Sequence, residues 1–149
     1  SSAVSNARLL DSRTVDLAGL TIGGLSGNYA PTQYDKPRSA LRGDRRRHFV
    51  REDVEALKRV GDLDVLLTHE APHGTAVQEE YSVGCRPIDE LIEVLDPDLA
   101  LIGHHHQHTV TTIDGTTVVT AAPAWESYYE LDPDSLAVKR FDTADLGLD

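Results

Sequence analysis

The chain has 149 residues, of which 25 are acidic and 14 are basic, so its net charge is −11. This length fits one compact domain whose core is large enough to fold without disulfides or a structural metal. The negative charge repels nucleic acid at long range, and no stretch reaches the roughly 18 apolar residues that indicate a membrane-spanning helix.

The N-terminal elements are predicted to be a pair of short strands. Residues 15–17 and 20–25 flank a turn at Gly19, which predicts a hairpin that ends in glycines. Residues 26–48 contain prolines, glycines and many polar side chains, so we expect a long loop, and such loops in compact domains are usually functional. Residues 51–60 then show the spacing of an amphipathic helix.

Two buried strands are expected in the middle of the chain. Residues 64–68 and 99–102 are short apolar runs of the kind found in buried strands. Residues 69–86 are predicted to form a loop, and Pro87 suits the first turn of a helix that ends near residue 95. Each predicted buried strand is therefore followed by a polar segment.

The C-terminal part is predicted to be a β-meander. An Asp-Gly pair separates residues 109–113 from residues 116–120, and this pair between β-rich runs is a strong hairpin signal. Residues 127–131 and 136–141 predict a further strand pair. The whole pattern predicts a single domain over residues 1–149 with an α/β fold, in which helices flank a mixed β-sheet.

The histidines mark the predicted site. His69 follows the first buried strand, and four of the seven histidines lie between residues 104 and 108, directly after the second. Ligands of open α/β sheets bind beyond the carboxyl ends of strands, so the two loops are expected to meet. In an extended segment alternate side chains point the same way, which would bring His104 and His106 together. Neutral imidazoles in such a group indicate a Zn, Mn or Fe site.

Ordinary roles compete with this interpretation. A single histidine such as His69 is more often a core or capping residue than a metal ligand. A cluster of four histidines, in contrast, favours metal binding over a solvated polar loop. His73 and His108 are assigned to loops without a metal.

One combination of motifs is more specific. Residues 66–72, Leu-Leu-Thr-His-Glu-Ala-Pro, are followed after about thirty residues by Gly-His-x-His, which begins at Gly103. A glycine-rich run at residues 23–29 and the Arg-His-Phe segment at residues 47–49 accompany them. Together these residues resemble the calcineurin-like metallophosphoesterase family over about residues 8–130. The layout is most similar to the lariat-debranching-type branch and its archaeal relatives.

The resemblance implies the C-terminal part of an αββα metallophosphoesterase fold. His69 matches the family's isolated ligand histidine, His104 joins it on one metal, and His106 reaches the other. In a complete enzyme, two Mn, Zn or Fe ions hold a phosphomono- or phosphodiester, including one derived from nucleic acid, and activate the attacking hydroxide. Glu70 is assigned to orient His69 from outside the set of metal ligands.

The family's N-terminal motifs are absent from this sequence. Asp-x-His, Gly-Asp-x-x-Asp and Gly-Asn-His-Asp/Glu, which would supply bridging carboxylates and a histidine acid, do not occur. No catalytic residue is therefore assigned, and at most about one metal ion per chain is expected. Three alternatives stay open: a fragment or degenerate paralogue, one chain of a split two-chain phosphoesterase, or a non-catalytic metal-binding or regulatory module.

A basic segment lies in the loop before the first predicted helix. Arg45, Arg46, Arg47 and His48 are consecutive in an otherwise acidic chain, and guanidinium groups match phosphate oxygens. Together with Asn28 from the glycine-rich run, they are predicted to bind the substrate. Because the whole chain is acidic, these residues are expected to attract nucleic acid only at close range. The alternative is a solvated loop whose arginines balance nearby acidic residues.

The remaining expectations concern the setting of the protein. Cys85 is the single cysteine and cannot form an internal disulfide, which suggests a reducing, cytoplasmic environment. Scarce lysine, abundant aspartate and no methionine suggest a salt-loving organism. Besides a phosphoester substrate, we expect no membrane partner, and either a homo-oligomer or a partner chain that supplies the missing half-site.

Overall fold

The computed structural model of the chain describes residues 9–78, 81–104 and 107–147. The strands are β1 (Arg13–Leu17), β2 (Leu20–Leu25), β3 (Val65–Thr68), β4 (Thr75–Gln78), β5 (Tyr81–Val83), β6 (Leu99–Ile102), β7 (Thr109–Ile113), β8 (Thr116–Thr120), β9 (Ser127–Leu131) and β10 (Val138–Asp142). The α-helices are α1 (Pro31–Tyr34), α2 (Arg51–Lys58) and α3 (Arg86–Leu95), and short 3-10 helices span Arg38–Ala40, Gly43–Arg47 and Thr143–Leu146. Within the described ranges, no helix is long and apolar enough to cross a membrane.

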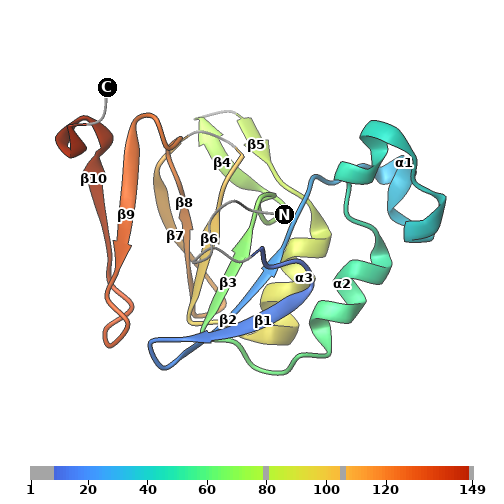
Figure 1. Cartoon of the computed structure of the whole chain (residues 1–149), viewed down its shortest axis with the longest axis horizontal. Helices are drawn as coiled ribbons and strands as arrows, with labels where there is room; N and C mark the ends of the chain where they lie inside the picture. Colours follow the sequence, from blue (N-terminus) through green and yellow to red (C-terminus); the bar gives the residue numbers. More distant parts are fainter. Residues whose placement is uncertain (1–8, 79–80, 105–106, 148–149) are drawn as a thin grey trace.

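One mixed sheet forms the centre of the fold (Figure 1). Its six strands are hydrogen-bonded in the order β1-β2-β3-β6-β8-β7. The inner strands β2, β3, β6 and β8 run parallel, while β1 and β7 pair antiparallel with their neighbours at the two edges. The predicted α/β fold with a mixed sheet is therefore confirmed.

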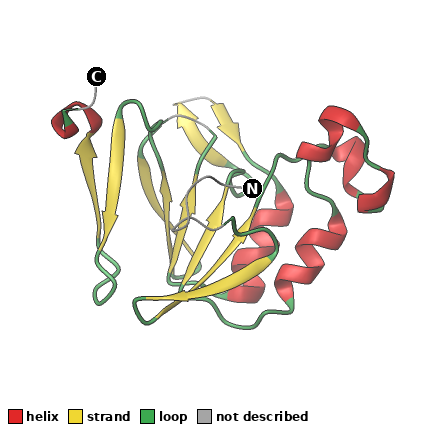
Figure 2. Cartoon of the chain, in the orientation of Figure 1, coloured by secondary structure: helices red, strands yellow, loops and turns green. Residues whose placement is uncertain are grey.

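Helices α2 and α3 cover one face of this sheet, and the β9–β10 hairpin lies on the opposite side (Figure 2). The main hydrophobic core fills the space between helices and sheet. Its strand residues are Leu25, Leu66, Ala100, Ile102 and Val118, and its helix residues are Val54, Leu57, Ile88, Leu91, Ile92 and Leu95. The buried positions of α3 recur with the three- and four-residue spacing of an amphipathic helix, so burial of this stripe fixes the helix on the sheet.

The opposite face of the sheet is covered less completely. Buried there are Val65, Leu99 and Val119, against which Leu131, Leu136 and Val138 of the hairpin region pack. Other apolar side chains of the same cluster stay only partly buried, namely Leu20, Ile22, Leu67 and Leu101. An apolar sheet face is normally buried by a second layer, so this face has room for further packing.

The structure adds short elements to those predicted. The first hairpin, both buried strands, the helices near residues 51 and 87 and the C-terminal strand pairs occur close to their expected bounds. The predicted loop over residues 69–86 contains the β4–β5 hairpin, and the loop over residues 26–48 contains α1 and two 3-10 helices. Elements this short show too few periods of apolar spacing to be recognised from sequence.

Candidate metal site and arginine-lined cavity

The loops that carry the site follow three neighbouring parallel strands. The last residues of β2, β3 and β6 are aligned in register across the sheet. Asn28, His69 and His104 come soon after these strand ends. Because parallel strands about 4.8 Å apart end at the same edge of a sheet, the three side chains are brought to one place.

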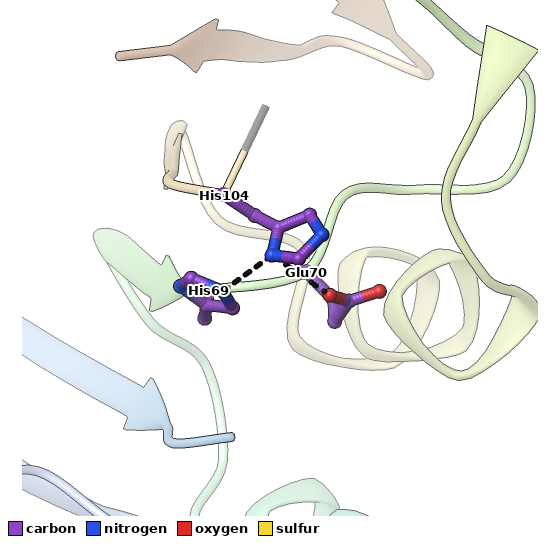
Figure 3. A group of neighbouring side chains, drawn as sticks. All are labelled: His69, Glu70 and His104. Atoms are coloured by element: carbon purple, nitrogen blue, oxygen red, sulfur yellow. Dashed lines mark hydrogen bonds and ion pairs between the residues drawn. The ribbon is translucent and has the colours of Figure 1, made fainter. Parts of the chain in front are cut away.

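His69, Glu70 and His104 form a compact group (Figure 3). Nδ1 of His104 lies 2.5 Å from Nε2 of His69 and 3.5 Å from Oε1 of Glu70. One potential ligand atom from each residue lies within 4.8 Å of the others. The amide Nδ2 of Asn28 is 3.5 Å from the same nitrogen of His104, so His104 is the common contact of the group.

Local backbone geometry turns these side chains toward one another. His104 has a φ of 71°, in the left-handed region that residues other than glycine rarely adopt. The expectation of extended backbone is therefore wrong at His104. The prediction that His104 and His106 converge stays untested, because His106 lies outside the described residues. After β3, the Thr68 hydroxyl donates to the carbonyl oxygen of Glu70 at 2.7 Å and stabilises a bend.

Glu70 is more closely involved than predicted. Its side chain is only 12% exposed. Burial raises the pKa of its carboxyl, and the nearby imidazoles of His104 and His48 oppose this effect. A buried carboxylate is unfavourable unless a cation or hydrogen-bond donors compensate it. Two imidazoles and a carboxylate suit Zn²⁺, Mn²⁺ or Fe²⁺, so the group fits a divalent transition-metal ion.

A cavity of about 610 Å³ opens beside His69. Its polar lining includes Asn28, Arg38, Arg46, Arg47, His48 and His69. Most of the residues predicted to bind substrate therefore share one cavity, whereas Arg45 is not among the described residues that line it. Cationic side chains next to a potential metal site suit an anionic ligand.

Gly27 allows the basic segment to approach the end of β2. Its φ is 100°, and a Cβ at this position would clash with the carbonyl oxygen of Arg47. The N–H of Asn28 donates to that same oxygen at 3.0 Å, and the N–H of Phe49 donates to the carbonyl oxygen of Asn28 at 3.0 Å. These bonds form a short parallel bridge between Asn28 and His48, which joins the arginines to the sheet edge.

Arg38 is a cavity residue that sequence reasoning missed. Its guanidinium donates to the carbonyl oxygens of Arg46 at 2.9 Å and His48 at 2.7 Å, and it pairs with the carboxylate of Asp53. The Asp53 carboxylate also accepts from the N–H of Val50 at 2.9 Å, at the start of α2. Arg38 therefore anchors the basic segment to α2, through backbone contacts that leave no sequence motif.

Replacing Asp53 by alanine is expected to lower the free energy of unfolding by about 1–2 kcal/mol. The substitution removes the acceptor for Val50 at the start of α2 and the ionic partner of Arg38. Urea denaturation measures the change, with Asp62→Ala at an exposed position as the control. Equal stability of the two variants would show that this anchor contributes nothing to the fold.

The other described histidines lie outside the group. His108 stacks on Tyr129, and its Nδ1 is 3.2 Å from the tyrosine hydroxyl. His73 is exposed and lines a separate cavity with Asp89. These positions agree with the prediction that His73 and His108 are loop residues.

Fold and site together define a mixed α/β domain with a His-Glu-His group beside an arginine-lined cavity. No protein-family model and no curated protein sequence matches the chain. One similar crystal structure has a TM-score of 0.69 and 18% sequence identity, covering 91% of this chain and 54% of the other. That of TT1561 from Thermus thermophilus has a TM-score of 0.64 and 16% identity, covering 90% and 58%. At this level of identity, the similarity concerns the fold alone. The chain spans a little over half the length of these two proteins.

Proposed function

We propose that the chain is the C-terminal half of a two-metal phosphoesterase of the calcineurin-like type, which hydrolyses a phosphomono- or phosphodiester. One observation carries the proposal. His69 and His104, at the ends of adjacent parallel strands, have ring nitrogens 2.5 Å apart beside a cavity lined by arginines. A pair of metal-binding side chains next to a cationic cavity is an arrangement suited to phosphoester hydrolysis.

Each residue has its own task in the proposed reaction. The imidazoles of His69 and His104 would hold one metal ion, and His106, which lies outside the described residues, would bind the other. When bound, metal ions of this kind polarise phosphoryl oxygens and lower the pKa of a bound water. Neutral imidazoles leave the positive charge of the metal available to the substrate, while Arg46 and Arg47 bind the remaining phosphate oxygens.

The missing half-site could pack on the sheet face that is incompletely covered. Leu20, Ile22, Leu67 and Leu101 stay partly buried on the face opposite the helices. The two similar solved proteins are also longer than this chain, which covers 54% and 58% of them. In the proposal, a segment that carries the bridging carboxylates packs on this face, as part of a longer protein or as a partner chain.

Comparison of the chain with a completed form tests the proposal. The chain alone, assayed with Mn²⁺ and a chromogenic phosphodiester, is expected to turn over poorly and to retain at most about one metal ion after dialysis. A form completed with Asp-x-His and Gly-Asp-x-x-Asp motifs, in one polypeptide or two, should bind a pair of ions and hydrolyse the substrate. If that form binds its metals but leaves phosphomonoesters and phosphodiesters intact, the proposal is wrong.

A non-catalytic metal-binding module is the second candidate function. The observation in its favour is that His69, Glu70 and His104 already converge within this chain. On this alternative, the metal serves stability or regulation, and neither form of the protein hydrolyses phosphoesters. Removal of the metal with a chelator would then lower the melting temperature in the absence of any turnover.

A further inference from the structure

We propose that Glu70 is a direct metal ligand, and that His69, Glu70 and His104 bind a single Zn²⁺-like ion using this chain alone. The family resemblance gives Glu70 only an orienting role and takes the carboxylate ligands from the absent N-terminal motifs. A complete three-residue site in this chain is therefore a separate property. It holds or fails independently of phosphoester hydrolysis.

The bend after β3 brings two consecutive residues to the same point. In a strand, neighbours such as His69 and Glu70 would point to opposite faces. Here both residues lie in a bend, where the Thr68 hydroxyl donates to the carbonyl oxygen of Glu70 at 2.7 Å. His104, carried by the loop after β6, contacts both of them through one ring nitrogen (Figure 3).

One of the donor-atom separations already matches that of a zinc site. With bonds of about 2.0–2.2 Å, ligand atoms in a tetrahedral zinc site lie about 3.3–3.6 Å apart. Oε1 of Glu70 is 3.5 Å from Nδ1 of His104, which matches this separation. The nearest nitrogens of His69 and His104 are 2.5 Å apart. If the two rings moved apart by about 1 Å, these nitrogens would reach the spacing of a zinc site.

Electrostatics favours a cation at this position. The Glu70 side chain is 12% exposed, so its carboxylate has lost much of its hydration. In its neutral form, an imidazole such as that of His69 or His104 offers a nitrogen lone pair to a metal ion. Two imidazoles and a carboxylate are also the donors of catalytic zinc sites that keep a fourth position open. A divalent ion would compensate the buried carboxylate and satisfy all three donors.

Zinc titration against a competing chelator tests this ligand set. Glu70→Gln keeps the shape of the side chain and removes its charge. It is expected to weaken Zn²⁺ binding by more than about 100-fold, because groups that only orient a ligand account for about 10- to 100-fold. Glu93→Gln, on the exposed surface of α3, is the matched control and should bind zinc like the parent. A smaller loss in Glu70→Gln, or no zinc binding by the parent, overturns the proposal.

A cysteine at position 70 gives a readout besides affinity. A thiolate bound to Co²⁺ produces a sulfur-to-cobalt charge-transfer absorption band, so Glu70→Cys loaded with Co²⁺ should show this band. The parent protein is the control, because Cys85 is buried and burial raises the pKa of its thiol to about 12. Cobalt bound to Glu70→Cys without the band would overturn direct ligation, whatever the phosphoesterase assays give.

Discussion

Replacing His104 by alanine is expected to lower phosphodiester hydrolysis by the completed enzyme at least about 100- to 1,000-fold, the loss that follows removal of one preorganised electrostatic group. His104 contacts both His69 and Glu70, so its loss removes a proposed metal ligand and opens the group. The measurement is kcat/KM for a chromogenic phosphodiester at saturating Mn²⁺, together with the metal content. Because the metal would act on the transition state, kcat should fall more than KM rises.

His108→Ala is the matched control for this substitution. His108 belongs to the same histidine-rich segment but contacts Tyr129 instead of the metal group. Its replacement should change the free energy of unfolding by no more than about 0.5–1 kcal/mol and leave turnover close to that of the parent. If both variants lose activity equally, the effect belongs to the fold of the segment and the role proposed for His104 is wrong.

Replacing both Arg46 and Arg47 by alanine is expected to give the second large effect. The Michaelis constant of the completed enzyme for a polynucleotide should rise about 10- to 100-fold, because a hydrogen bond to a charged group contributes about 1.5–3 kcal/mol. Both arginines line the cavity beside His69. The net charge of −11 opposes attraction at long range, so the arginines should act only on bound phosphates. A small phosphoester, which reaches the metal site without extended contacts, should be affected much less.

Salt dependence separates phosphate recognition from a general effect of charge. For a single-stranded polynucleotide, removal of each arginine that binds a phosphate should lower the slope of log affinity against log salt by about 0.7. The control is Arg45→Ala combined with Arg59→Ala, which removes the same charge from exposed residues that do not line the cavity. Equal slopes and equal Michaelis constants for the two double variants would mean that the arginines only balance acidic residues on a solvated surface.

The strands that position the candidate site could be predicted because their sequences allow little else. Residues 65–67 and 99–102 are short runs of apolar residues, which suits buried strands. Parallel neighbours in one sheet must end at a common edge, and the pairing of β3 with β6 fulfils this condition. The meeting of His69 and His104 follows from that pairing.

The contacts that shape the candidate site could not be predicted in the same way. Arg38 bonds to the carbonyl oxygens of Arg46 and His48, and every residue type carries that same acceptor. Nor does strand alternation suggest that His69 and Glu70 contact the same group, because both lie in a bend after β3, where the Thr68 hydroxyl donates to the carbonyl oxygen of Glu70. Such features depend on where the chain stops being regular, which apolar periodicity does not encode.

The in-register ends of β2, β3 and β6 have a consequence for the energetics of ligand capture. Ordering a backbone costs about 1–2 kcal/mol per residue, and here most of that entropy is lost when the sheet forms, before any ion or phosphate arrives. His69 and His104 are already neighbours before a ligand arrives, so binding of an ion or a phosphate needs little further ordering of the chain. The ligand affinity of such a site therefore depends on how rigidly the sheet holds these side chains. A cavity made deep in the core, remote from every ligand atom, should therefore weaken binding as well as folding.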